Sequence, residues 1–321
     1  MSKNTNAHYC GIGGQAVLEG VMMKNEDKYA VAVRKPDGQV AVEVDSFEST
    51  GGKTVLKIPF IRGIFQFIDS LRLGMKVLTF SSSFYEEEEE EGAVEKFLDR
   101  ITGGKGEKIL TVILEIASVL LAIGLFIVLP YMVSSHFDGY IRNHSILMLI
   151  EGGIRILIFL LYSVGIGLMK DVRRLYQYHG AEHKCINCIE RGRELTPENV
   201  MKSSRLHKRC GTSFIFFVLI VSVVIFFFIH VDNIFLRICL RLLLLPVVAG
   251  ISYELIRLAG RHDNFLVKVL SAPGFLFQKL TTKEPDESMV EVAIASVEAV
   301  FDWRLYLQET FGYEVDEEEQ V

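Results

Sequence analysis

Four long apolar runs constrain the fold of this chain more than any other feature. They cover residues 109–135, 146–169, 212–230 and 234–255. Each run is close to the roughly 20 residues that an α-helix needs to cross the hydrocarbon core of a bilayer. A soluble helical core could imitate one such run but not all four, and 50% of the chain is hydrophobic, which is high for a soluble protein. We therefore expect an α-helical polytopic membrane protein with about four transmembrane helices.

Charged residues inside these runs need partners. The third run is uncharged from Phe214 to Ile229, whereas the fourth contains Arg237 and Arg241 near one end. Because a charge in hydrocarbon is costly, we expect these arginines either to extend outward to the membrane surface or to pair with Glu151 of the second run.

The distribution of Lys and Arg between the runs predicts the orientation. Residues 170–211 are rich in both, whereas the connections near 136–145 and 230–233 contain only Arg142. By the positive-inside rule, the 170–211 loop lies in the cytoplasm, and so do both termini.

By composition, the chain divides into a cytosolic β-rich part, an amphipathic helix with an acidic linker, a four-helix membrane domain with the 170–211 loop, and a cytosolic helical segment with an acidic tail. These regions cover residues 1–54, 55–108, 109–260 and 261–321. In the first, alternating apolar segments flank a turn at residues 36–38 and predict a β-hairpin. The amphipathic helix lies on the membrane surface or against the protein's own core, and both alternatives stay open. A second amphipathic helix is expected within 286–303.

Charge and cysteine usage exclude two classes of protein. The net charge of −6 argues against a general nucleic-acid binder. Five cysteines, an odd number, are typical of a reduced compartment and not of a disulfide framework.

The connection between the second and third runs carries the residues best suited to chemistry. His179 and His183 are four residues apart, so a helix places both imidazoles on one face, with Glu182 beside them. This H-x-x-E-H pattern can hold a divalent metal, with zinc the expected ion, while the carboxylate activates water. The topology brings Glu254 to the same membrane face as a third ligand, and Arg257 as a group that stabilises an oxyanion.

A second set of ligands lies in the same connection. Cys185 and Cys188, with His207 and Cys210 farther on, have the spacing of a closed structural zinc site. The two sites could coexist, and a mixed His/Cys set is also compatible with the sequence. The simplest alternative is that the short H-x-x-E-H pattern arises by chance and that the cysteines are small residues of a reduced loop.

Four separated segments carry a family resemblance. They are residues 13–23 (GGQAVLEGVMM), 178–184 (YHGAEHK), 207–214 (HKRCGTSF) and 273–282 (PGFLFQKLTT). In this order they resemble the YqhQ-like family of bacterial membrane proteins, and the resemblance covers nearly the whole chain. It implies a bacterial inner-membrane protein of a family of unknown function, sometimes labelled a metal-dependent enzyme. The segments leave out Cys185 and Cys188, so the resemblance favours the His/Glu set.

We therefore expect a metal-dependent enzyme, hydrolytic in its chemistry, at the cytoplasmic face of the bacterial inner membrane. The lipid bilayer is its expected partner, and the sequence indicates neither a substrate nor an oligomeric state. The alternative is a non-enzymatic membrane scaffold or assembly factor whose structural metal or polar cluster shapes the middle loop. A transporter is less favoured, because four runs show no evident repeat and few polar groups near the expected membrane midplane.

Overall fold

Two compact units make up the structure. The computed structural model describes residues 8–85, 101, 106–137, 139–229, 231, 233–261 and 265–313. The first unit combines Met1–Tyr85, Gly165–Val218 and Pro246–Val321, and the second combines Glu86–Val164 and Leu219–Leu245. Each unit is therefore assembled from segments that are far apart in the sequence.

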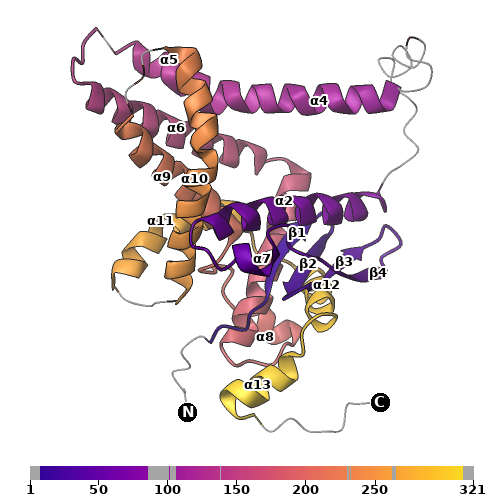
Figure 1. The fold of residues 1–321 in the computed structure, drawn as a ribbon. Helices are drawn as coiled ribbons and strands as arrows, with labels where there is room; N and C mark the ends of the chain where they lie inside the picture. Colours follow the sequence, from indigo (N-terminus) through magenta and orange to yellow (C-terminus); the bar gives the residue numbers. More distant parts are fainter. Residues whose placement is uncertain are drawn as a thin grey trace. The chain divides into compact units, whose positions relative to one another are not determined.

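A four-stranded antiparallel sheet occupies the amino-terminal part of the first unit (Figure 1). Its strands pair in chain order: β1 (Gly13–Val17), β2 (Gly20–Asn25), β3 (Lys28–Arg34) and β4 (Val40–Ser46). The turns between them include Glu19, Glu26 and Gly38, with positive φ angles of 49°, 54° and 85°. The predicted hairpin is confirmed as β3 and β4, and two further strands precede it.

Short and medium helices complete the first unit. Those lying wholly within it are α1 (Gly52–Val55), α2 (Ile61–Ser82), α7 (Lys170–Glu190), α8 (Pro197–Met201), α11 (Phe265–Thr281), α12 (Glu287–Glu298) and α13 (Trp303–Phe311). The predicted helix within 286–303 is confirmed as α12. It begins after Asp286, whose carboxylate accepts a hydrogen bond of 2.9 Å from the backbone N–H of Met289 and so caps the helix.

The central strands β2 and β3 are buried on both faces of the sheet, because successive side chains of a strand point to opposite sides, whereas β4 is mostly exposed. Val21 and Met23 of β2 belong to a core shared with α7 and α12. Met22, which lies between them, belongs to a second core shared with Leu73 and Val77 of α2. The sheet is thus enclosed between α2 on one face and α7 with α12 on the other.

The amphipathic helix predicted within 55–108 is α2, and it packs on the protein's own core. Leu73 and Val77 are buried against the sheet. Phe67, Leu71 and Met75 are exposed. α2 therefore has one face in the core and further apolar side chains that are exposed, of which Phe67 contacts the ring of Phe214.

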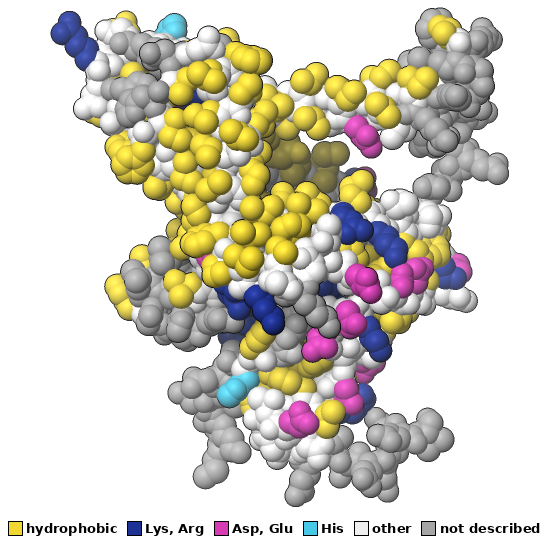
Figure 2. All heavy atoms as spheres, in the orientation of Figure 1, with side chains coloured by type: hydrophobic (Ala, Val, Ile, Leu, Met, Phe, Trp, Pro, Cys, Tyr) yellow, Lys and Arg dark blue, Asp and Glu magenta, His cyan; other side chains and the backbone are white. Residues whose placement is uncertain are grey.

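Apolar helices dominate the second unit. It contains α4 (Gly106–Ile123), the π-helical turn η1 (Gly124–Val128), α5 (Leu129–Ser135) and nearly all of α6 (His144–Ile166). It also includes the later part of α9 (Gly211–Phe227) and the first part of α10 (Ile234–Arg261). Many exposed side chains of α4 are hydrophobic, as expected for a helix that faces lipid (Figure 2).

Among the described residues, three helical stretches are long and apolar enough to cross a membrane. They are Ile109–Ser135, Ser145–Ile166 and Phe235–Gly260. The third predicted run corresponds to α9, which is apolar but has only 17 residues, the lower end of the range that spans a bilayer. By length and composition, the first, second and fourth predicted runs are confirmed as candidate spans. The third run is a shorter apolar helix.

The predicted partner of the two arginines in α10 is confirmed within the second unit. The carboxylate of Glu151 lies 3.8 Å from Nη1 of Arg237 and forms a hydrogen-bonded ion pair with Arg241. A third cation, Arg155, lies one helical turn after Glu151 and 2.9 Å from the same carboxylate. The arginines therefore pair inside the unit instead of extending outward.

Candidate metal centre

The second half of α7 is buried although it is rich in polar residues. From Gly180 to Glu190 every residue is buried, so each polar side chain needs an internal partner. The ammonium of Lys184 donates to the carbonyls of Met201 and Ser203 at 2.8 and 3.0 Å and pairs with Glu284 at 2.9 Å. The connection that follows α8 therefore wraps around α7 and closes its polar face.

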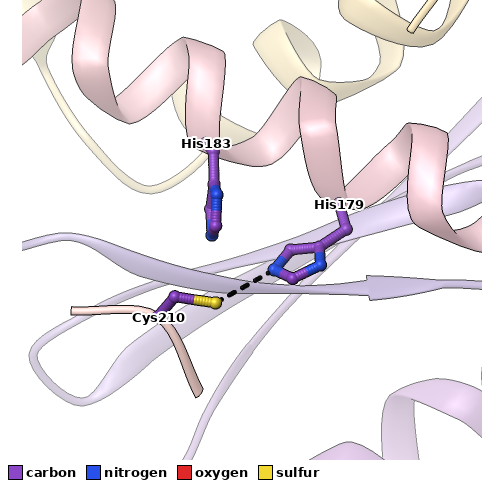
Figure 3. Close-up of side chains that lie close together, drawn as sticks. All are labelled: His179, His183 and Cys210. Atoms are coloured by element: carbon purple, nitrogen blue, oxygen red, sulfur yellow. Dashed lines mark hydrogen bonds between the residues drawn. The ribbon is translucent and has the colours of Figure 1, made fainter. Parts of the chain in front are cut away.

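Three potential ligands converge beside this face. His179 and His183 lie one turn apart on α7, and Cys210 immediately precedes α9. One ligand atom of each lies within 4.8 Å of the other two, and Nε2 of His179 is 3.2 Å from the sulfur of Cys210 (Figure 3). His179 is half-buried, whereas the other two are buried. The cluster is thus the mixed His/Cys set that the sequence left open.

Both imidazoles are held by backbone carbonyls. Nδ1 of His179 lies 2.9 Å from the carbonyl oxygen of Thr281, and Nδ1 of His183 lies 2.6 Å from that of Arg205. A carbonyl oxygen only accepts hydrogen bonds, so each Nδ1 carries a proton, and in the neutral form of each imidazole Nε2 keeps the lone pair that can bind a metal. Metal-binding histidines in proteins are oriented in this way by a hydrogen bond from the second ring nitrogen.

The sulfur of Cys210 is stabilised as a thiolate. Burial by itself would raise its pKa, but His183 and His179 outweigh burial and lower the pKa well below the usual value for cysteine. For His179 burial would lower the pKa, and the adjacent Cys210 sulfur raises it to about 9. The backbone N–H of Thr212 also donates to the sulfur at 3.3 Å. Since a thiolate is the form of cysteine that binds metals, the cluster offers two nitrogens and one anionic sulfur.

Glu182 lies beside the cluster with a raised pKa. Burial raises the pKa of its carboxyl, and His183 and His179 lower it only in part. The carboxyl therefore gives up its proton less readily than a solvated glutamate, which suits a group that takes and returns a proton.

The amino-terminal glycine segment forms one wall of this site. A Cβ on Gly14 of β1 would lie 2.8 Å from Cγ of Glu182 and 2.7 Å from the carbonyl oxygen of Met22. Only glycine fits between the strand and α7 at this point. The sequence singled out residues 13–23 but assigned them no role. The adjacent glycines Gly13 and Gly14 were the feature that could have indicated a close contact here.

Glu19 joins the same segment to α7. Its carboxylate forms a bidentate ion pair with Arg174 and accepts a hydrogen bond of 3.3 Å from the hydroxyl of Tyr178. Glu19 sits in the turn between β1 and β2, where its φ is positive. The turn is therefore anchored one residue before His179.

Glu254 and Arg257 lie outside the cluster. The carboxylate of Glu254 accepts hydrogen bonds from Nε of Arg62 at 2.7 Å and from the backbone N–H of Phe60 at 3.1 Å. Arg257 lies within electrostatic range of Glu254. Glu254, which was predicted to be the third metal ligand, is therefore paired with Arg62 of α2. The third residue of the cluster is Cys210.

The predicted closed cysteine site is not assembled among the described residues. The thiol of Cys188 donates to the carbonyl of Glu194 at 3.3 Å, and burial raises its pKa to about 11. Burial also raises the pKa of Cys185, while Nε2 of His207 lies 3.4 Å from the carboxylate of Glu190. Of the four residues, only Cys210 joins a group of ligands.

Comparisons with known proteins support the family resemblance. A sequence profile of the family described as "Protein of unknown function (DUF1385)" matches residues 58–303. The chain is 35% identical over 286 residues to the uncharacterized protein YqhQ of Bacillus subtilis (strain 168), an alignment that covers 88% of this chain and 90% of that protein. No solved structure matches. The three clustered ligands and Glu182 all lie within the part that the profile matches.

Proposed function

This chain belongs to the DUF1385 family of proteins of unknown function, and we propose that it is a metal-dependent enzyme, hydrolytic in its chemistry, at the cytoplasmic face of a bacterial membrane. His179, His183 and Cys210 would hold the metal. The observation that carries the proposal is the convergence of these three ligand atoms within 4.8 Å, with both imidazoles oriented by backbone carbonyls.

The ligand set fits zinc with one position open. Two imidazole nitrogens and one thiolate are preferred zinc ligands, and catalytic zinc sites keep three protein ligands and leave the fourth position to water or substrate. When bound, the metal would lower the pKa of a water molecule so that hydroxide forms near neutral pH. The half-buried ring of His179 marks the side from which a substrate would approach.

Glu182 is the proposed acid–base residue. Its carboxyl is buried next to the cluster, and its pKa is raised by that burial. It would take the proton of an attacking water and return it to the leaving group, the usual role of a carboxyl with a raised pKa in hydrolysis. Glu254 and Arg257 have no part in this proposal, because Glu254 is paired with Arg62.

The cytoplasmic placement rests on the distribution of charge. The connection from 170 to 211, which carries the two histidines and Cys210, is the segment rich in Lys and Arg. In membrane proteins such segments stay on the cytoplasmic side. The site would then meet cytosolic or membrane-surface substrates.

A structural metal is the second candidate, and one observation favours it. The cluster joins α7 to the residue preceding α9, and His179 also contacts the end of α11 through Thr281. A metal held by these residues would tie α7 to the start of α9, and the bond from His179 to Thr281 would add the end of α11. The protein would then be a scaffold or assembly factor without turnover.

Metal content tests the site itself. We expect stoichiometric zinc, or another transition metal, in the full chain purified in detergent without chelator and measured by elemental analysis. The His179→Ala/His183→Ala double variant and Cys210→Ser should lose it. Cys188→Ser, a thiol on α7 outside the cluster, should keep it and is the matched control. An absence of metal in the wild-type protein would overturn the proposal.

Glu182→Gln separates the enzyme from the scaffold. The amide fills the same space but cannot take a proton. We expect metal to stay bound while hydrolysis in a screen of ester, amide and phosphoester substrates is lost. Loss of metal in this variant would instead make Glu182 a ligand, and an active Glu182→Gln protein would remove its acid–base role.

A further inference from the structure

A buried cluster of four charged side chains lies in the second unit, apart from the metal centre. Glu151 and Arg155 come from α6, and Arg237 and Arg241 from α10. Their side chains are 1%, 7%, 12% and 5% exposed, respectively. Three guanidinium groups thus share one carboxylate, and within the described part of the chain the cluster holds an excess of two positive charges.

The hydrogen bonds of the cluster are incomplete. Nη2 of Arg241 pairs with Glu151, but its Nε and Nη1 are buried without a hydrogen-bond partner among the described residues. A guanidinium carries five N–H groups, so three of those on Arg241 are unused. The aromatic ring of Phe226, 5.1 Å from Arg241 and 5.8 Å from Arg155, supplies only cation–π contacts. Oε2 of Glu151 is also buried without a hydrogen-bond partner, but one acceptor cannot use three free donors or offset the excess charge. The remaining donors and the excess charge call for an anion.

The cluster lies within the first half of each of its two candidate spans. Glu151 is six residues from Ser145, and Arg241 is six residues from Phe235, the first residues of their candidate spans. At a rise of 1.5 Å per residue this depth is about 9 Å, whereas the midplane of a hydrocarbon core about 30 Å thick lies about 15 Å deep. Arg237 is closer still to the end, is the most exposed member, and donates to the carbonyl of Val231 at 2.9 Å. An anion at the membrane surface would reach the cluster by way of Arg237.

We propose that Arg155, Arg237 and Arg241 form a binding site for a phosphate group, carried either by an anionic phospholipid headgroup or by inorganic phosphate. A phosphate presents several oxygens in a geometry that the planar arginine fork matches with paired hydrogen bonds. Its negative charge offsets the excess that Glu151 leaves. The site shares no residue with the metal centre, so either proposal can fail without the other.

The test uses the full chain and two arms that separate the sources of phosphate. In the first, native mass spectrometry of the detergent-purified protein looks for retained phospholipid, and binding of phosphatidylglycerol is measured after delipidation. In the second, the delipidated protein is titrated with inorganic phosphate by calorimetry. Binding in the first arm alone identifies a lipid headgroup, and binding in the second arm alone identifies the free anion. Binding in neither arm overturns the proposal.

Variants tie any binding to the cluster. Arg241→Lys keeps the charge but loses the fork, and we expect affinity to fall at least about tenfold. Arg142→Gln removes a cation from the exposed connection before α6 and should leave affinity unchanged. If Arg241→Lys does not yield folded protein, Arg237→Gln, at the exposed edge, carries the same expectation. Unchanged affinity in the cluster variant, or an equal loss in Arg142→Gln, would show that phosphate does not bind there.

Discussion

The protein buries charged side chains in two regions, and the two regions satisfy them differently. Around α7, Lys184 and Asn187 each donate to two backbone carbonyls, and each imidazole of the candidate metal centre is held by one. In the second unit three arginines share Glu151, and Arg241 has N–H groups without a partner among the described residues.

The difference separates two kinds of site. Backbone carbonyls cannot change rotamer, so a network that ends on them fixes its side chains before any ligand arrives, which is what a metal site requires. A buried network with free donors is costly unless something outside the chain completes it. Removing a hydrogen-bond partner should therefore destabilise the fold in the first region. In the second region the same kind of change should weaken the binding of phosphate.

The largest effect is expected where the backbone around α7 is tightest. An alanine Cβ at Gly180 would lie 2.0 Å from the carbonyl oxygen of Lys283. We expect Gly180→Ala to destabilise the first unit by about 3 kcal/mol, since only backbone movement can relieve the clash. Thermal unfolding followed by circular dichroism, and by the fluorescence of Trp303, the single tryptophan, would measure it.

The matched control is the same substitution in the second unit. Gly153 of α6 has no atom within 4 Å of its ideal Cβ. Gly153→Ala should be neutral, or should stabilise the helix by up to about 1 kcal/mol. Equal tolerance of the two substitutions would contradict the close packing of α7 against residue 283.

Asn187→Leu tests the carbonyl network directly. The side-chain amide donates to the carbonyls of Ser204 and Leu206 at 2.7 and 3.0 Å, on either side of the Arg205 carbonyl that holds His183. Leaving two buried acceptors without donors should cost about 2 kcal/mol, and we also expect weaker metal retention. Urea unfolding and elemental analysis would show both effects.

Asn199→Leu provides the comparison for that variant. The Asn199 amide also donates to a backbone carbonyl, that of Glu194 at 3.1 Å, but this bond lies at the surface. Because water can replace it, we expect a loss below about 0.5 kcal/mol and unchanged metal. Similar losses in the two variants would mean that burial around α7 is less complete than the structure shows.

Arg241→Met should cost little stability in lipid-free detergent. Glu151 keeps Arg155 and Arg237 as partners, and the change removes unsatisfied donors together with an excess charge. We expect a change within about 1 kcal/mol of the wild type. A loss of about 3 kcal/mol or more in thermal unfolding would make this cluster a closed structural network like that of α7.

The smallest effect is expected for Glu254→Gln. The ion pair with Arg62 is partly exposed, with side chains 21% and 16% accessible, so it should contribute about 0.5 kcal/mol. Metal content should not change. Loss of metal in this variant would restore Glu254 as a ligand, as the sequence predicted, and would show that the site extends beyond the residues clustered around α7.

Local spacing and charge made part of the structure predictable. The four-residue interval between His179 and His183 was sufficient to place both rings on one helical face. The pairing of Glu151 with Arg237 and Arg241 was one of the two arrangements that the cost of charge in apolar helices allowed. The first inference needed only the geometry of a single helix. The second needed only the rule that a charge in an apolar helix requires a partner or access to the membrane surface.

Contacts between distant segments were not predictable. Glu254 pairs with Arg62 because α2 packs closely on α10, where a Cβ on Gly63 would lie 2.7 Å from the Cβ of Tyr253. Nothing in the sequence indicated that approach. Nor did the sequence show that Gly14 lies against Glu182, since the two residues are separated by about 170 residues of chain.

The discontinuous first unit has a consequence for biosynthesis. The sheet is covered by α12, where Ser296 donates to the carbonyl of Ala30 at 3.0 Å, yet roughly 250 residues separate the end of β4 from the end of α12. At ribosomal rates of about 5–20 residues per second, the strands emerge about 10–50 seconds before their cover. During that interval the apolar face of β2 is open, and the intervening hydrophobic helices are delivered to the membrane. We expect nascent strands in this state to be prone to aggregation until α12 has been synthesised.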